Sequence, residues 1–181
     1  MRKLLNEELG RPTLEEYGET PKMPIVVVMD NVRSAQNVGS LFRTSDAFGI
    51  ERIMLCGITS TPPNREIHKT ALGAELSVAW SYYATTAECV AQLRVEGYRI
   101  VAVEQVEGAT MLDEFRLDAE AKYALVFGNE VMGVEQEVVD MCDGAIEIPQ
   151  IGTKHSLNVS VAGGVVIWNF FEALKQEVCD I

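Results

Sequence analysis

The sequence lacks the features of disulfide-bonded, zinc-binding and membrane-spanning proteins. It has only two histidines, and its four cysteines are scattered without a C-x-x-C pair: Cys56, Cys89, Cys142 and Cys179. Reduced, structural thiols are therefore expected, and no metal site. No apolar run is long enough to span a membrane, and the first residues lead into Asn6, Glu7 and Glu8 rather than an apolar signal core. A cytoplasmic location is the expectation.

Two nucleotide-binding motifs are also missing. Neither the phosphate-binding loop G-x-x-x-x-G-K-[ST] nor the dinucleotide fingerprint G-x-G-x-x-G occurs in the chain. Both motifs place glycine backbone and a helix N-terminus against phosphate groups. Their absence argues against nucleotide hydrolysis and against dinucleotide-dependent redox chemistry.

Basic residues are scarce, because 15 Lys and Arg stand against 27 Asp and Glu, which gives a net charge of −12. Proteins that bind nucleic acids usually gain affinity from Lys and Arg that displace counterions, so this balance argues against such a role. A net charge does not fix the local field, however, since acidic groups can gather away from a basic cleft. Five cations lie in or beside candidate site loops: Arg33, Arg43, Arg65, Lys69 and Lys154.

The chain contains enough apolar residues for one hydrophobic core, and predicted strands and helices alternate along it. It has 181 residues, of which 48% are hydrophobic, as expected for a single domain. Residues 1–23 are polar and interrupted by glycine and proline, so we interpret them as an N-terminal extension to a domain that spans 24–181. Apolar runs predict strands at 25–29, 52–56, 99–103, 123–127 and 145–148. Helices are predicted over 36–48, from 85 or 86 to 96, from about 135, and over 157–178.

This alternation of strands and helices predicts an α/β fold with a mainly parallel sheet and helices on both faces. In such sheets, binding sites lie beyond the carboxyl ends of the strands. Three segments with polar or glycine residues follow predicted strands or begin the helices after them. We expect these three segments to converge.

The first segment, Asn37-Val38-Gly39-Ser40-Leu41-Phe42-Arg43, lies at the start of a predicted helix. Asn37, Ser40 and Arg43 are three residues apart, so they drift slowly around one side of the helix and can face a common ligand. Arg43 offers a planar, charged group suited to an RNA phosphate or an incoming hydroxyl group. From the residues alone, the favoured interpretation is a capping Asn37, a Gly39 that permits close packing and an Arg43 that is solvated or salt-bridged.

The second segment, Phe127-Gly128-Asn129-Glu130, follows a predicted buried strand. A glycine at this position lets backbone groups approach a ligand without an intervening side chain. Glu130 is expected either to accept a hydrogen bond from a ligand or to hold Arg43 in place. The alternative is a structural turn in which Glu130 lies favourably near a helix N-terminus.

The third segment runs from Ile148-Pro149 through Gln150 and His155 to Ser156-Leu157-Asn158. Ser156 is predicted to cap the last helix. That helix is apolar on nearly every face and contains Gly163-Gly164, so it is expected to be buried all round, either by a second subunit or in the core of a monomer. His155 could act as a general base, although a structural hydrogen bond is favoured.

In their order, spacing and residue types, the three segments resemble the SpoU/TrmH branch of the SPOUT RNA methyltransferases. The resemblance covers about residues 24–174. It implies a deep trefoil knot in the C-terminal part, S-adenosylmethionine as cofactor and a homodimer with active sites near the subunit interface. The implied activity is methyl transfer to a ribose 2′-hydroxyl of RNA. We see no room for the separate N-terminal RNA-binding domain of several members that modify ribosomal RNA, so tRNA is favoured over rRNA.

By motif position, the resemblance implies five active-site residues: Asn37, Arg43, Glu130, Ser156 and Asn158. It also implies cofactor contacts, largely through the backbone, from seven residues: Phe127, Gly128, Asn129, Ile148, Gln150, Ser156 and Leu157. Because a guanidinium stays protonated, we expect Arg43 to orient the hydroxyl group and stabilise its developing charge. A second group or a water molecule would then take the proton.

Other functions stay open at this point. A non-catalytic RNA-binding or assembly factor on the same fold is favoured by the acidity, and a small-molecule transferase with the same cofactor is a weaker alternative. An rRNA substrate is also possible. Four aromatic residues could stack on bases, but packing is favoured and no site role is assigned to them: Trp80, Tyr82, Tyr83 and Tyr98.

Overall fold

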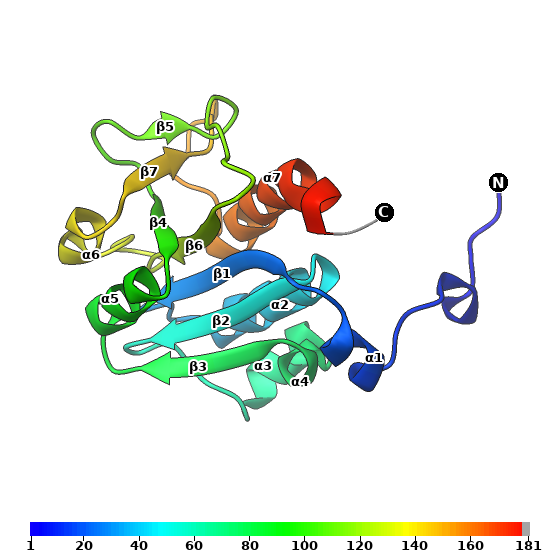
Figure 1. The fold of residues 1–181 in the computed structure, drawn as a ribbon. Helices are drawn as coiled ribbons and strands as arrows, with labels where there is room; N and C mark the ends of the chain where they lie inside the picture. Colours follow the sequence, from blue (N-terminus) through cyan, green and yellow to red (C-terminus); the bar gives the residue numbers. More distant parts are fainter. Residues whose placement is uncertain (179–181) are drawn as a thin grey trace.

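A seven-stranded parallel sheet forms the centre of the protein, in a computed structural model that describes residues 1–178 (Figure 1). The strand order is β3-β2-β1-β6-β4-β7-β5, and every neighbouring pair is parallel. The strands are β1 (Met23–Asp30), β2 (Ile50–Cys56), β3 (Ala79–Tyr83), β4 (Tyr98–Val103), β5 (Thr110–Met111), β6 (Lys122–Phe127) and β7 (Gly144–Glu147). The prediction of a parallel α/β sheet is confirmed.

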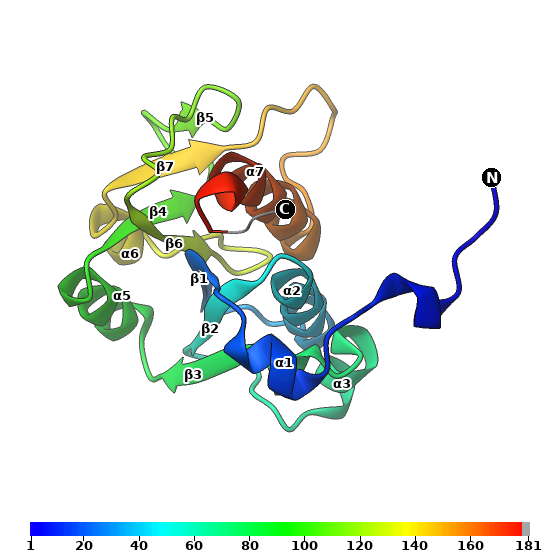
Figure 2. The same cartoon turned by 45° about the vertical axis from the view of Figure 1, so that its right-hand side comes forward.

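Helices cover both faces of this sheet (Figures 1 and 2). The helices are α1 (Leu14–Glu19), α2 (Ala35–Ala47), α3 (Arg65–Ala71), α4 (Ala74–Ser77), α5 (Thr86–Val95), α6 (Gln136–Asp140) and α7 (Val159–Val178), and a 3-10 helix spans Asn6–Leu9. In β1, Ile25 and Val27 pack in a core with α2, α3 and α7, whereas Val26 and Val28 pack against α5 and α6. Burial on both faces explains why this strand is apolar without alternation.

Side-chain caps start three helices just beyond the strand ends. Ser34 Oγ accepts a hydrogen bond from the N–H of Asn37 at the start of α2, and Thr85 does the same for α5. Asn64 Oδ1 accepts from two N–H groups at the start of α3. These caps satisfy donors that have no partner inside the helix and fix where each chain segment turns back across the sheet.

The prediction that Ser156 caps the last helix is wrong. Asn158 directly precedes α7, and its Oδ1 accepts hydrogen bonds from the N–H of Ser160 at 2.9 Å and from the Ser160 hydroxyl group at 2.6 Å. Serine and asparagine are about equally good caps, so residue type alone did not decide between them. The helix therefore begins two residues later than predicted.

The last helix is not buried all round within one chain. Val166 and Phe170 lie in the core, but Val161, Val165 and Trp168 are 52%, 40% and 50% exposed. Residues spaced by four and three lie on one side of a helix, so these three form a continuous apolar surface, which we call the α7 stripe. Within one chain the helix is therefore only partly buried, in contrast to the expected burial on every face.

The N-terminal extension lies outside the sheet and reaches away from the body of the molecule (Figure 2). Helix α1 is fixed by a hydrogen bond from the Tyr17 hydroxyl group to the carbonyl oxygen of Asp46, at 3.1 Å. Within residues 1–178, no helix combines the length and the apolar character needed to cross a membrane.

Close packing of α2 on α3 depends on Gly39. A Cβ atom at this position would lie 2.2 Å from Thr70 Oγ1 and 2.3 Å from the carbonyl oxygen of Ile67. Both distances are far below van der Waals contact, and the carbonyl cannot move unless α3 moves. The predicted packing role of Gly39 is confirmed.

We expect Gly39→Ala to lower the free energy of unfolding by about 1–3 kcal/mol, because the added methyl group overpacks the α2–α3 contact. Urea denaturation followed by circular dichroism measures this change. Gly18→Ala in α1 is the matched control, since a Cβ there meets no atom within 4 Å. That substitution should leave stability unchanged or raise it by up to about 1 kcal/mol. Equal effects of the two substitutions would contradict the packing argument.

Candidate active site

The Glu130 carboxylate joins loops that follow two neighbouring strands. It accepts hydrogen bonds from the backbone N–H groups of Arg33 and Ser34 and from Asn37 Nδ2, each at 2.9 Å. Asn37 Oδ1 in turn accepts a hydrogen bond from Asn158 Nδ2 at 3.2 Å. We call these contacts the Glu130 network. It brings together residues of all three segments singled out in the sequence.

Glu130 does not hold Arg43, which corrects one of its two predicted roles. Its oxygens are taken by the loop after β1 and the first turn of α2, where backbone N–H groups point toward an acceptor. Burial raises the pKa of Glu130, but hydrogen bonds from Arg33, Asn37 and Ser34 outweigh burial and leave the pKa below its ordinary value. The group is therefore an anion at neutral pH.

A cavity of about 500 Å³ opens beside the Glu130 network, between the ends of β6 and β7 and the start of α7. Glu130 and Asn158 line it, as does His155. So do all seven residues that the resemblance assigned to the cofactor: Phe127, Gly128, Asn129, Ile148, Gln150, Ser156 and Leu157. We call it the main cavity.

A tight turn after β6 shapes one wall of the main cavity. Asn129 and Gly133 exchange two backbone hydrogen bonds, each 2.9 Å long. Asn129 Nδ2 also donates to the carbonyl oxygen of Asn31 at 2.8 Å, which ties the turn to the loop after β1. A Cβ atom at Gly128 would lie 2.1 Å from the backbone of Gly133 and Val134. Glycine is required here because backbone folds directly over the position.

Two further acids of the main cavity were missed by the sequence analysis. Glu104 and Glu147 line it together with Glu130. Glu104 accepts hydrogen bonds from the N–H groups of Val134 and Gln105, both at 2.9 Å. Glu104 directly follows β4, and Glu130 follows β6 by a few residues. A carboxylate just beyond a predicted buried strand was therefore the sequence signal that could have identified Glu104. Three carboxylates make the cavity favourable for a cation.

Arg43 lies elsewhere in the single chain. It is exposed and borders a separate hollow with Tyr17, Phe48 and Phe171. Six residues along a helix amount to about 9 Å and about 120° of rotation, so Arg43 points away from Asn37. The prediction that both face one ligand is therefore wrong within one chain. The Ser40 hydroxyl group is engaged within the helix, because it donates a hydrogen bond to the carbonyl oxygen of Gln36.

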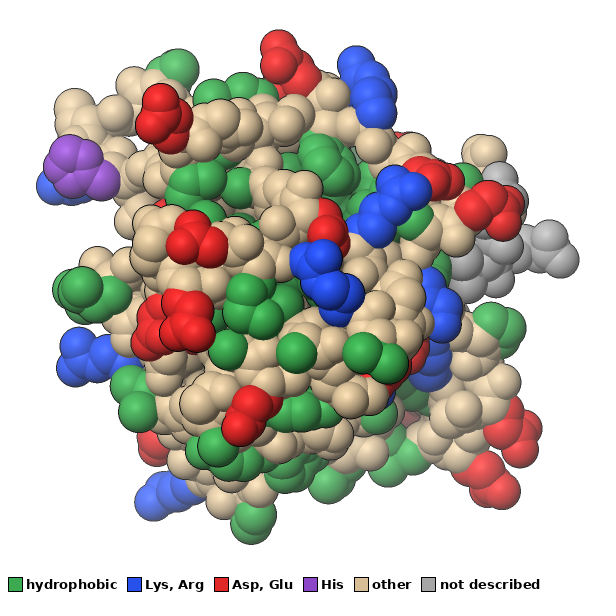
Figure 3. Space-filling view, turned by 60° about the vertical axis from the view of Figure 1, so that its left-hand side comes forward, with side chains coloured by type: hydrophobic (Ala, Val, Ile, Leu, Met, Phe, Trp, Pro, Cys, Tyr) green, Lys and Arg blue, Asp and Glu red, His purple; other side chains and the backbone are tan. Residues whose placement is uncertain are grey.

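The cations beside the site loops differ in whether they are paired with acidic side chains. Among the described residues, the exposed Arg33, Arg43 and Arg65 form no ion pair, whereas Lys69 pairs with Glu66 at 2.6 Å. On the face drawn in Figure 3, acidic and basic side chains are interspersed. Cations near the site loops thus remain available to a polyanion.

Cysteines and metal ligands form no site in the part of the chain that the structure describes. Cys56, Cys89 and Cys142 are free thiols, and Cys179 lies outside the described residues. Burial and the neighbouring thiol of Cys56 raise the pKa of Cys89 well above its ordinary value, so this thiol is inert. Within residues 1–178, no group of three or more His, Cys, Asp or Glu side chains is arranged to hold a metal ion.

Comparison with known proteins agrees with this geometry. Residues 24–168 match the model of the SpoU rRNA methylase family. The chain belongs to this family. A putative TrmH family tRNA/rRNA methyltransferase of Staphylococcus aureus (strain MSSA476) is 29% identical over 158 residues, which make up 87% of this chain and 62% of the relative. The chain therefore spans about three fifths of the length of such curated SpoU relatives.

Solved structures of the SpoU/TrmH type share the fold. The A. aeolicus TrmH/SpoU tRNA modifying enzyme superposes with a TM-score of 0.80 at 26% identity, covering 91% of this chain and 82% of that one. An AdoMet-bound rRNA methyltransferase from Sinorhizobium meliloti gives a TM-score of 0.77 at 28% identity, covering 87% and 60%. The resemblance to SpoU/TrmH proteins in sequence is confirmed.

We expect Glu130→Gln to destabilise the protein by about 1 kcal/mol at pH 7, because a neutral amide is a weaker acceptor for three donors. The pKa of Glu130 is lowered in the folded state, so its contribution is present above the unfolded pKa and is lost as pH falls through the folded pKa. The wild type and the variant should converge once the pH falls below the folded-state pKa of Glu130.

Urea denaturation between pH 7 and pH 3 measures this difference. Glu137→Gln, at an exposed position in α6, is the matched control and should follow the wild type at every pH. A stability gap that stays constant with pH would show that the charge of Glu130 is not what holds the loops.

Proposed function

We propose that the chain is an S-adenosylmethionine-dependent RNA methyltransferase that acts on a ribose 2′-hydroxyl group, with tRNA as its favoured substrate. The observation that carries this proposal is that the Glu130 network borders the main cavity, because Glu130 and Asn158 belong to both. Membership of the SpoU family supports methyl transfer to RNA. The similarity to a tRNA modifying enzyme supports tRNA, and the modest size of the matching region agrees with a compact substrate.

The main cavity fits S-adenosylmethionine in size and charge. Its volume of about 500 Å³ lies in the range of small-molecule sites, and its three carboxylates suit a ligand with a sulfonium and an ammonium group. Bound there, the cofactor would supply an electrophilic methyl group. Gly128 exposes backbone groups to it, and the chain around Ile148 and Leu157 would hold its other side.

The Glu130 network prepares the place of the acceptor ribose. Asn37 donates to Glu130 and accepts from Asn158, so both amide groups are held in position before substrate arrives. Positioned donors and acceptors of this kind orient a hydroxyl group for in-line attack. Ser156, on the wall of the main cavity, is assigned to the same task.

A second copy of the chain would complete the site. Arg43 borders a hollow with Phe48 and Phe171, whose rings lie 5.1 Å apart, and Trp168 of the α7 stripe lies 5.6 Å from Phe48. These aromatic side chains and Arg43 thus form one continuous surface, as expected where chains associate. A homodimer on the α7 stripe would carry Arg43 toward the main cavity of the partner. For the C-terminal part we also propose the deep trefoil knot that the resemblance to the family implies.

The charge of Arg43 defines its proposed role. A guanidinium keeps its proton and offers fixed donors, so it would bind the hydroxyl oxygen and stabilise the negative charge that develops on it. A second group or a water molecule takes the proton. Arg33 and Arg65 would add phosphate contacts that offset the net charge of the chain.

A non-catalytic RNA-binding role on the same fold is the second candidate, favoured by the net charge of −12. Calorimetric titration with S-adenosylmethionine separates the two, since a scaffold that has lost catalysis needs no cofactor. Binding of one cofactor per chain supports the enzyme. Failure of a folded dimer to bind it supports the scaffold.

The proposed activity is tested by incubating the protein with methyl-labelled S-adenosylmethionine and either bulk tRNA or rRNA, followed by digestion to nucleosides. Label is expected in 2′-O-methylated nucleosides from tRNA. Label on a base would reject the ribose assignment, and label only in rRNA would reject the tRNA preference. Activity that persists without RNA would identify a small-molecule transferase.

We expect Arg43→Lys to lower the turnover number by about 100-fold, because an ammonium lacks the fixed pair of donors. Its affinity for S-adenosylmethionine should stay unchanged, since Arg43 lies outside the main cavity of its own chain. Single-turnover methylation and calorimetry measure the two effects. Arg116→Lys is the control, because this exposed arginine lines neither the main cavity nor the hollow at Arg43. Near-full turnover of Arg43→Lys would exclude a role for the guanidinium.

A further inference from the structure

A second hollow, of about 550 Å³, lies beside α3, α4 and β3 and takes no part in the Glu130 network. Pro62, Pro63, Leu76 and Trp80 provide its apolar surface. Four polar side chains also line it: Asn64, Arg65, His68 and Glu75. We call it the α3 hollow.

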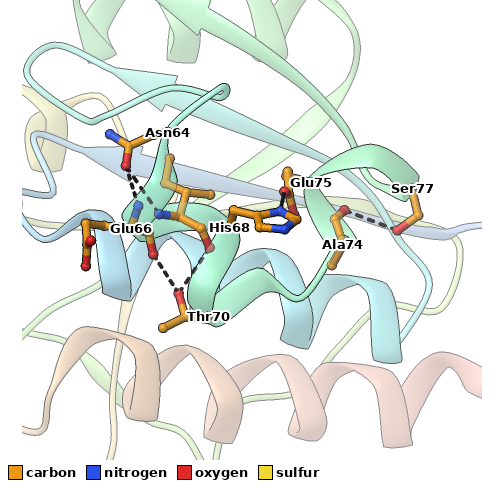
Figure 4. Close-up of polar contacts among 8 residues, drawn as sticks. Asn64, Glu66, His68, Thr70, Ala74, Glu75 and Ser77 are labelled. Carbon is orange, nitrogen blue, oxygen red and sulfur yellow. Dashed lines mark hydrogen bonds and ion pairs between the residues drawn. The ribbon is translucent and has the colours of Figure 1, made fainter.

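Glu75 is the unusual group in the α3 hollow. Its side chain is only 9% exposed, and its Oε1 lies 2.5 Å from His68 Nδ1 (Figure 4). Its Oε2 is buried and has no hydrogen-bond partner among the described residues. Burial raises the pKa of Glu75, but the contact with His68 and the field of nearby backbone N–H groups outweigh burial and lower it. A buried anionic oxygen without a donor is costly, which points to a ligand that donates.

The neighbours of Glu75 define which donors and acceptors remain. A carboxylate can only accept, so the proton between the two groups is carried by His68 Nδ1, which donates to Glu75. Asn64 Oδ1 is used by the N–H groups of Glu66 and Ile67, which leaves its amide N–H₂ as a donor. The hollow therefore presents the Glu75 carboxylate as an acceptor and the Asn64 amide as a donor beside an apolar wall, with the Arg65 cation close by.

The α3 hollow is connected to the proposed active site through α2 and α3. Gln36, next to Asn37 of the Glu130 network, donates from Nε2 to Glu66 at 3.3 Å and accepts from Thr70 Oγ1 at 2.9 Å. Both contacts are with α3, whose first residue, Arg65, borders the hollow.

We propose that the α3 hollow binds a base of the RNA substrate that carries an exocyclic amino group. This inference rests on the proposed function, because it takes the ligand to be RNA. Trp80 and the two prolines offer flat apolar surface to the ring. The amino group donates to Glu75 Oε2, and Arg65 approaches the sugar-phosphate backbone. Cytosine, with an amino group at position 4, fits; uracil, with a carbonyl oxygen there, would face the carboxylate with a second acceptor.

Tryptophan fluorescence tests the proposal directly. The chain has two tryptophans, so in a Trp168→Phe background the emission reports on Trp80 alone. We titrate this protein with cytidine 5′-monophosphate and with uridine 5′-monophosphate, which differ at position 4 of the pyrimidine ring. Saturable quenching is expected with cytidine monophosphate, and affinity for uridine monophosphate should be about tenfold lower.

Substitution of the acceptor gives the matched variant. In Glu75→Gln the amide can donate to a carbonyl oxygen as well as accept, so the preference for cytidine monophosphate should disappear. Glu88→Gln, an exposed position in α5 on the other face of the sheet, should keep the preference. If Glu75→Gln does not fold, the comparison of the two nucleotides on the Trp168→Phe protein still decides.

Equal affinities for the two nucleotides, or no quenching by either in the millimolar range, would overturn the inference. A preference that survives in Glu75→Gln would also overturn it, because the acceptor would lie elsewhere. The measurement needs neither S-adenosylmethionine nor methyl transfer. Discrimination without any methylation of RNA would reject the proposed function alone, whereas methylation without discrimination would reject only the binding of a base in the α3 hollow.

Discussion

The carboxylate of Glu130 is the contact on which the arrangement of the site depends. It accepts hydrogen bonds from groups that lie 93 to 97 residues earlier in the chain. Two parallel neighbours, β1 and β6, bring these loops to the same edge of the sheet, but sheet pairing ends at Met29 and Phe127. Beyond that point the loops are held by Glu130, and through Asn37 the same contact reaches the start of α7.

Charge is distributed in a way that suits two different ligands. The main cavity is acidic, which favours a cationic cofactor, whereas the exposed Arg33, Arg43 and Arg65 lie on the loops and helices that follow β1 and β2. A chain with a net charge of −12 can therefore bind a polyanion through local cations, at an affinity that falls steeply with salt. The proposed dimer would double the number of these cations on one particle.

Much of the fold could be predicted from the distribution of apolar residues along the sequence. Strands buried on both faces give continuous apolar runs, and each of the five predicted strands is present. The edge strand β3 was missed because its residues are mostly exposed, and β5 because it has only two residues. The short helices α3 and α4 carry too few turns for a helical period to appear.

The candidate site was predictable in part. Family resemblance identified seven of the residues that line the main cavity, but Glu104 belongs to no motif and needed the sheet order to be found. The cap of α7 could not be chosen between Ser156 and Asn158 from residue type. The direction of Arg43 depends on helix rotation, and its proposed target lies in another molecule, which no pattern within one chain can specify.

Complementation between two inactive variants tests the division of the site between two chains most directly. Gly128→Ala displaces the turn that forms one wall of the main cavity but keeps Arg43, whereas Arg43→Ala keeps this wall and lacks the guanidinium. Each alone should be inactive, and a mixed population should regain about one quarter of wild-type methyl transfer, because half of randomly paired dimers are hybrids with one intact site. No recovery, in a mixture whose subunits demonstrably exchange, would contradict a site shared between two copies of the chain.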